Sequence, residues 1–263
     1  MYENATLMEV LEVGTLAAKE AGKVHLKYFK NAKEVREKNK RDLVCKADLE
    51  SEKAIIDIIK EKFPDHNILS EEIGEINQDS EYTWVIDPLD GTGNFLKGSK
   101  DFCVLVSLQN KGETILGITW FPATEDLYIA QKGKGATKNG NKIVVKTEST
   151  LPKLYANTHM SSIEELRKSN LQIYSDLLFK VRNIKVFSAC IGRALTDVAE
   201  GIADFHFRKG FHKWDYTAGA LLIEEMGGNV SDFDGNSLSE NTKDVVVSNN
   251  GKHKEILAMV NES

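Results

Sequence analysis

The stretch of this chain best suited to chemistry is WVIDPLDGTGNF, residues 84–95, where a short apolar run ends in acids and small residues. Asp87 and Asp90 lie three residues apart across a turn, and Gly91 gives the backbone the freedom to bring both carboxylates towards one point. Converging oxygen ligands suit a hard cation such as Mg²⁺, with positions left for water and a phosphate. A plain Asp-Pro turn, with Asp90 capping a short helix, fits the same residues, so the turn alone leaves both interpretations open.

Strands must hold these acids in place. Residues 83–86 are short, β-branched and aromatic, which predicts a buried strand. Pro88 has no N–H for a ladder and disfavours helix before it, so the strand is expected to end there. A second strand-like run, residues 68–70, leads into Glu71 and Glu72. Because neighbouring strand residues face opposite sides, one of these acids should point inward and the other into solvent.

Helical spacing of apolar residues predicts two helices upstream, over residues 6–29 and 49–63, the second ended by Pro64. Asp48 stands just before the second helix, where an ordinary N-cap is expected. The charged segment 30–41 between the helices has little apolar content. It predicts a solvated loop or hairpin, with a mobile role at the site as the alternative.

The pattern changes near residue 150, which divides the chain into an N-terminal α+β lobe, 1–150, and a C-terminal α/β lobe, 151–263. The first lobe is expected to contain a meandering antiparallel sheet, and residues 132–135 read as a hairpin turn rather than a phosphate loop. In the second lobe strands and helices alternate. Its strands are predicted at residues 154–158, 184–188, 203–207 and 245–248, and its helices at 161–180, 193–200, 215–226 and from 252.

Composition limits the class of protein. The chain has 263 residues, of which 41% are hydrophobic, enough for one large domain or two lobes. Its 40 acidic and 34 basic residues argue against nucleic acid or an anionic membrane as a partner. Three cysteines without paired spacing predict neither a disulfide framework nor a zinc site, and a reducing cytoplasm fits best. No basic leader and no long apolar run are present in the sequence, so we expect a soluble, unexported protein.

Three ordered acidic motifs together resemble the inositol monophosphatase family, which includes the Mg²⁺-dependent, lithium-sensitive sugar and nucleotide phosphatases. The motifs are ILSEE at 68–72, WVIDPLDGTGNF at 84–95, and WDYTAG at 214–219 followed by EMGG at 225–228. The resemblance implies a phosphoric monoester hydrolase with a layered α/β/α/β/α sandwich of the sugar-phosphatase type. It also implies a site at the junction of the lobes and a homodimer.

The resemblance further implies two or three Mg²⁺ ions per site, with most ligands from the N-terminal lobe and one from the C-terminal lobe. Glu71, Asp87 and the Leu89 carbonyl are implied to hold one ion, and Asp87, Asp90 and Asp215 a second.

The same resemblance assigns the attacking water to Glu71, Thr92 and Asp48, so that Asp48 is more than an N-cap. We expect Asp90, Gly91, Thr92 and Asp215 to bind the substrate, together with Arg208, which is not a residue of the family pattern. We expect direct in-line attack by water on a small phosphate monoester, without a phospho-enzyme.

One residue departs from the family pattern. Arg208 stands seven residues before Asp215, where animal-type members have a glutamate that holds inositol hydroxyls. A cation there favours a second anion, as in fructose 1,6-bisphosphate or 3′-phosphoadenosine 5′-phosphate, unless Arg208 faces solvent. The motif GTGNF at 91–95 instead favours an inositol-1-phosphate-like substrate. Both substrate classes stay open, as does a regulatory or binding protein that retains the fold.

Overall fold

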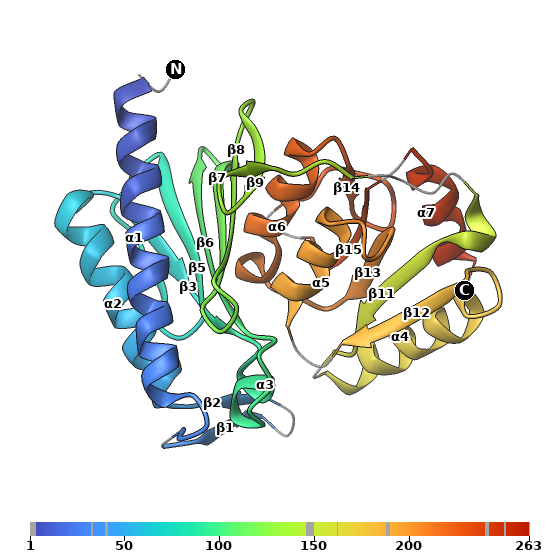
Figure 1. Ribbon diagram of the computed structural model, residues 1–263, viewed down its shortest axis with the longest axis horizontal. Coiled ribbons are helices and arrows are strands. Elements are labelled where there is room, and N and C mark those ends of the chain that lie inside the picture. The colour runs from blue at the N-terminus through green and yellow to red at the C-terminus, as the bar shows by residue number, and fades with distance from the viewer. Residues whose placement is uncertain are drawn as a thin grey trace.

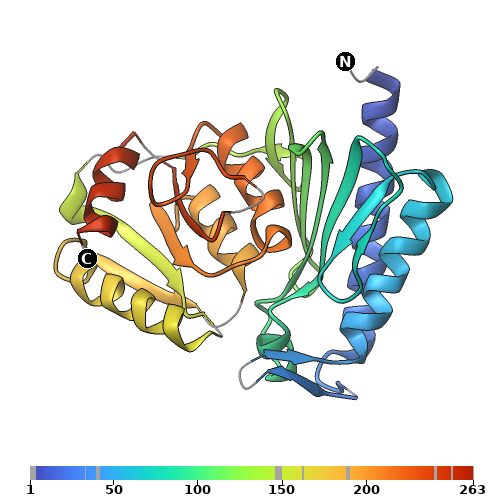
Figure 2. The same cartoon turned by 180° about the vertical axis from the view of Figure 1, so that it is seen from behind.

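The computed structural model describes residues 4–32, 34–39, 42–145, 150–161, 163–187, 190–239, 242–249 and 251–262. Helices and sheets alternate in five layers, with one sheet on each side of a central pair of helices (Figures 1 and 2). The arrangement confirms the α/β/α/β/α class that the motifs implied. Within these ranges, no helix is both long enough and apolar enough to cross a membrane.

The first outer layer consists of α1 (Asn4–Tyr28) and α2 (Lys46–Lys62), which pack against each other and against one face of the larger sheet. Small residues on α1 make the close packing possible. A Cβ added at Gly22 would lie 2.3 Å from the indole nitrogen of Trp120 on the sheet. Trp84, fully buried, fills the interface beneath α1.

The larger sheet has eight strands in the order β10-β9-β8-β7-β6-β5-β3-β4. All neighbours are antiparallel except β3 and β5, which confirms the predicted meander. The turn at 132–135 joins β8 to β9, also as predicted. The strands are β3 (Asn67–Ser70), β4 (Gly74–Ile76), β5 (Tyr82–Asp90), β6 (Cys103–Asn110), β7 (Glu113–Phe121), β8 (Asp126–Gln131), β9 (Gly135–Lys138) and β10 (Asn141–Lys142).

The central layer is formed by α5 (Ile191–Ala199) and α6 (Lys213–Glu225), which contact each other, with α6 lying on the larger sheet. The approach of α6 to β7 is very close, because a Cβ at Gly117 would lie 2.6 Å from the Ala218 carbonyl oxygen. The hydroxyls of Ser107 on β6 and Thr217 on α6 share a buried hydrogen bond of 2.7 Å. The two sheets are therefore joined through one packed layer.

The smaller sheet has five strands in the order β12-β11-β13-β15-β14. β11 runs parallel to β12 and β13, as strand-helix alternation predicts, whereas β15 is antiparallel to β13 and β14. α4 and α7 cover its outer face (Figure 1). The elements are β11 (Tyr155–His159), α4 (Glu164–Leu177), β12 (Asn183–Phe187), β13 (Phe205–Lys209), β14 (Asn229–Ser231), β15 (Asp244–Ser248) and α7 (His253–Asn261), preceded by the short helix η1 (Leu151–Lys153).

The strand through the acidic turn is longer than predicted. β5 does not end at Pro88 but continues to Asp90. Its register against β6 shifts between Asp87 and Asp90, so the strand is bulged there and the missing N–H of Pro88 costs no ladder bond. The Pro88 carbonyl accepts a 2.8 Å hydrogen bond from Nε2 of the buried His25 on α1. The hydrogen bond from α1 therefore holds the backbone of the bulge in place.

The segment 30–41 is partly a hairpin, one of the two predicted forms. β1 (Arg36–Asn39) pairs antiparallel with β2 (Asp42–Val44). Residues 33, 40 and 41 lie outside the described part of the chain.

Candidate active site

The predicted site residues other than Asp48 line one cavity of about 600 Å³ between the C-terminal end of β5 and the smaller sheet. Its acidic side is formed by residues from β5, from the end of β3 and from the first turn of α6. The opposite side carries basic residues of the smaller sheet. The lining includes Glu71, Asp87, Leu89, Asp90, Gly91, Thr92 and Asp215 on the acidic side, and His159 and Arg208 on the basic side.

Asp87 lies at the centre of the acidic side and is 2% exposed. Its Oδ1 accepts a 3.0 Å hydrogen bond from the Leu89 backbone N–H, which closes the bulge. Burial raises the pKa of Asp87 well above its ordinary value, and the nearby charges of Glu71, Asp90 and Asp215 raise it further. Four carboxylates from three separate elements are therefore close enough to repel one another.

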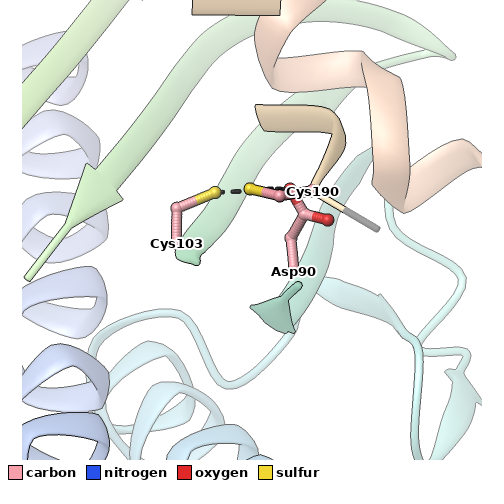
Figure 3. A group of neighbouring side chains, drawn as sticks. All are labelled: Asp90, Cys103 and Cys190. Atoms are coloured by element: carbon pink, nitrogen blue, oxygen red, sulfur yellow. Dashed lines mark hydrogen bonds between the residues drawn. The ribbon is translucent and has the colours of Figure 1, made fainter. Parts of the chain in front are cut away.

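Asp90 ends β5 and reaches across to the start of α5. Its Oδ1 accepts from the Ile191 N–H at 3.0 Å, and its Oδ2 from the Gly192 N–H at 2.6 Å. The thiol sulfurs of Cys103 and Cys190 lie 3.4 and 3.3 Å from Oδ2 (Figure 3). Burial raises the pKa of Asp90, while these four donors lower it. The backbone amides at the start of α5 thus bind a carboxylate of the larger sheet.

All three cysteines are buried and free, as the absence of paired spacing predicted. Burial raises the pKa of Cys190 to about 11, so its thiol stays protonated and can donate. No local pattern associates Cys103 or Cys190 with Asp90, because the packing of α5 on β6 brings them together.

Asp215 occupies the first turn of α6, where its Oδ2 accepts a 2.8 Å hydrogen bond from the His212 N–H. Burial raises the pKa of Asp215 to about 7, and the positive charge of Arg208 partly opposes this. No hydrogen bond or ion pair joins Arg208 to Asp215 among the contacts of the described chain.

Glu71 and Glu72 follow β3, and the prediction that one of them is solvated is wrong. Glu72 is the more buried, with 7% of its side chain exposed against 22% for Glu71. Strand alternation does not apply because β3 ends at Ser70. Lys38 of β1 bridges both acids, with Nζ 2.7 Å from Glu71 Oε1. The buried Glu52 accepts from the Glu72 N–H and the Ser70 hydroxyl, which fixes the turn that presents Glu71.

Asp48 is not the N-cap of α2, as an ordinary cap would require, but the third residue of the helix, where it forms a capping box with Cys45. The helix begins at Lys46 after the N-cap Cys45, and Asp48 Oδ2 accepts from the Cys45 N–H at 2.8 Å. Its Oδ1 accepts a 2.8 Å hydrogen bond from the Thr92 hydroxyl. Asp48 is 1% exposed and does not line the cavity, so it reaches the site only through Thr92. Burial raises the pKa of Asp48.

The donor set at the acidic side fits hard divalent cations. Among the described residues that line this side, the donors are oxygens of carboxylates and of the Leu89 carbonyl, which suit Mg²⁺. The thiols of Cys103 and Cys190 also lie within ligand distance of Asp90, but neither residue lines the cavity. Burial raises the pKa values of Asp87, Asp90 and Asp215, and the charges of neighbouring acids raise those of Asp87 and Asp215 further. Bound cations would supply the opposing positive charge.

The five layers, with a carboxylate-lined cavity between the two sheets, define a fold of the sugar-phosphatase type. The model of the inositol monophosphatase family matches residues 6–263, and the chain belongs to that family.

Individual relatives extend over nearly the whole chain. It is 34% identical to the Nus factor SuhB of Escherichia coli (strain K12), over 95% of this chain and 94% of that protein. It is 31% identical to Inositol monophosphatase 3 of Solanum lycopersicum, over 100% of both. The solved structure of inositol monophosphatase from Anabaena (Nostoc) superposes with a TM-score of 0.87 at 31% identity, covering 98% of this chain and 97% of that one.

Proposed function

We propose that this protein is a Mg²⁺-dependent phosphomonoesterase that acts on a small phosphorylated substrate, of which inositol 1-phosphate is the reference case. The observation that carries this proposal is the meeting of Glu71, Asp87, Asp90 and Asp215 in one cavity. The volume of about 600 Å³ is in the range of small-molecule sites. Acids from separate elements converge there although their mutual repulsion raises the pKa of Asp87.

Glu71, Asp87 and the Leu89 carbonyl would hold one Mg²⁺, and Asp87, Asp90 and Asp215 a second. Bound Mg²⁺ neutralises the phosphate, lowers the pKa of a water molecule and stabilises the leaving alkoxide. The count of two or three ions is part of the proposal.

The chain's own groups prepare the nucleophile. The Thr92 hydroxyl donates to Asp48, so its oxygen lone pairs remain available to accept a hydrogen bond from the attacking water. This orients the water without adding charge beside an anionic substrate. The Glu71 carboxylate then accepts the water's proton, and Asp48 acts as a positioning residue because Thr92 separates it from the cavity. Backbone N–H groups of Gly91 and Thr92 hold the phosphate oxygens while water attacks in line.

A glutamine variant tests the proposal. Purified protein with Mg²⁺ should release phosphate from a panel of sugar and inositol phosphates, and Glu71→Gln should reduce kcat by at least about a hundredfold. The matched control is Glu75→Gln, four residues along, whose side chain is exposed on β4. Loss of activity in both variants, or in neither, would contradict the role given to Glu71.

A regulatory role is the second candidate, because the relatives at 34% identity are named Nus factor SuhB. A wild-type protein that binds Mg²⁺ and is inert towards the whole ester panel would favour it. Family resemblance also supports our proposals of a homodimer, a cytoplasmic location and lithium sensitivity. Sedimentation, fractionation and inhibition assays test these separately.

A further inference from the structure

The basic side of the cavity is built by two neighbouring strands of the smaller sheet. β11 and β13 run parallel, with Thr158 opposite Phe207. One step further in the same register, His159 and Arg208 come side by side on the same face of the sheet. Each is only 8% exposed, and both line the cavity.

Neither residue has a polar partner. Nδ1 of His159 and Nε of Arg208 are buried without a hydrogen bond, and neither side chain forms an ion pair in the described part of the chain. One pair deeper on the same face, His206 Nδ1 is 2.7 Å from Asn157 Oδ1, and the Asn157 amide donates to a backbone carbonyl. The deeper pair is therefore hydrogen-bonded, whereas the pair at the cavity is not.

An unpaired guanidinium in such a place is costly, because a buried charge needs a counter-charge or hydrogen bonds. Asp215 and Asp90 attract Arg208 electrostatically but do not contact it. In the proposed holoenzyme these two acids are committed to Mg²⁺. Among the described residues, Arg208 then has no hydrogen-bonded or ion-paired carboxylate of its own, while Lys243 adds a further amine to the same lining.

We propose that Arg208 and His159 form a subsite for a second anionic group of the substrate, a phosphate or a carboxylate on the part that leaves. Arg208 supplies a permanent charge and planar N–H donors, which suit either anion, and His159 supplies one further ring N–H. Substrates with a second anion are therefore preferred over neutral polyol esters. The inference rests on the proposed function, because the acidic side must receive the scissile phosphate.

Non-hydrolysable ligands test the subsite without turnover. Alkane bisphosphonates of increasing length are compared by calorimetry, in the presence of Mg²⁺, with alkylphosphonates of the same length. At the best length we expect the bisphosphonate to bind about ten- to a hundredfold more tightly, the range of a charge-assisted hydrogen-bonded pair. Phosphonocarboxylates of the same lengths show whether the subsite prefers a phosphate or a carboxylate.

Variants assign the preference to the residues. Arg208→Gln should abolish it and His159→Gln should reduce it severalfold. The matched control Arg182→Gln should retain it, because Arg182 is exposed and stacks near Tyr155 outside the cavity lining. Thermal unfolding checks that each variant is folded.

Two results would overturn the inference: equal binding of both ligand classes by the wild type at every length, or a preference that survives in folded Arg208→Gln. If Arg208→Gln does not fold, the wild-type comparison and His159→Gln decide. Hydrolysis of simple monoesters is measured in parallel. Activity without any preference for a second anion would reject the subsite alone, and a preference without activity would reject the proposed hydrolase alone.

Discussion

Mg²⁺ binding should release protons from this site near neutral pH. A metal binds carboxylates in their charged form, so it displaces any proton that the site holds. In the metal-free protein, burial raises the pKa of Asp215 to about 7 and that of Asp87 well above its ordinary value. Acids with ordinary values near 4 would hold almost no protons at pH 7.

The magnitude follows from these values. At pH 7 a group with a pKa of about 7 is half protonated, so Asp215 contributes about half a proton, and the raised pKa of Asp87 acts in the same direction. The contribution of Asp215 should increase towards pH 6 and vanish near pH 9. Apparent Mg²⁺ affinity should therefore fall as pH decreases below 7, by about tenfold per pH unit for each proton displaced.

Calorimetry measures the protons directly. Mg²⁺ is titrated at pH 6, 7 and 8 into protein in two buffers whose ionisation enthalpies differ, and the difference in heat gives the number of protons released. Asp215→Asn, which lacks one titrating group, should release about half a proton less at pH 7. A binding heat that is the same in both buffers from pH 6 to 8 would refute the reasoning, because the acids would then already be charged.

Two further predictions concern the same acids. The pKa of Asp215 is higher in the folded protein than in the unfolded chain, so its contribution to stability is present at low pH and is lost as pH rises through 7. Between pH 6.5 and 8.5, the free energy of unfolding of the metal-free protein should therefore decrease by about 1 kcal/mol because of this group. Melting temperatures measured in EDTA check this decrease. The chosen pH values lie above those at which buried histidines such as His25 take up protons on unfolding, and a melting temperature that rises with pH would contradict the prediction. The Lys38 ammonium is bound to the Glu71 carboxylate and competes there with a cation. Lys38→Gln should therefore tighten Mg²⁺ binding about threefold to tenfold, whereas the exposed control Lys97→Gln should leave it unchanged. Unchanged affinity in Lys38→Gln would show that the lysine does not compete with the ion.

Local sequence patterns were sufficient for most of the elements. Apolar periodicity located α1 and the meander, and the family resemblance supplied the layered fold. Two local rules failed at the site itself. Pro88 was expected to end β5, but a bulge accommodates it. One of Glu71 and Glu72 was expected in solvent, but the chain turns after Ser70 and alternation does not apply to them. Both failures occur where backbone regularity is broken, which is where simple alternation and ladder rules stop applying.

The remaining misses depend on contacts between distant segments. Cys103 and Cys190 are 87 residues apart in number (190 minus 103) and meet at Asp90 only because α5 packs on β6. His159 carries no local motif, and its position beside Arg208 follows from the pairing of β11 with β13. Such pairings cannot be read from one sequence, whereas a row of acids with fixed spacing can.

The hydrogen bonds between Asp90 and the first turn of α5 have a consequence for how this protein can evolve. The same carboxylate fastens one half of the molecule to the other through two backbone amides. A descendant that abandons catalysis but keeps the architecture would be free to lose Glu71, whose carboxylate is bridged to Lys38 and, in the described structure, does not join the two sheets. It would be expected to keep Asp90, so the presence of that aspartate in a relative is a poor indicator of activity, and the presence of Glu71 is a better one.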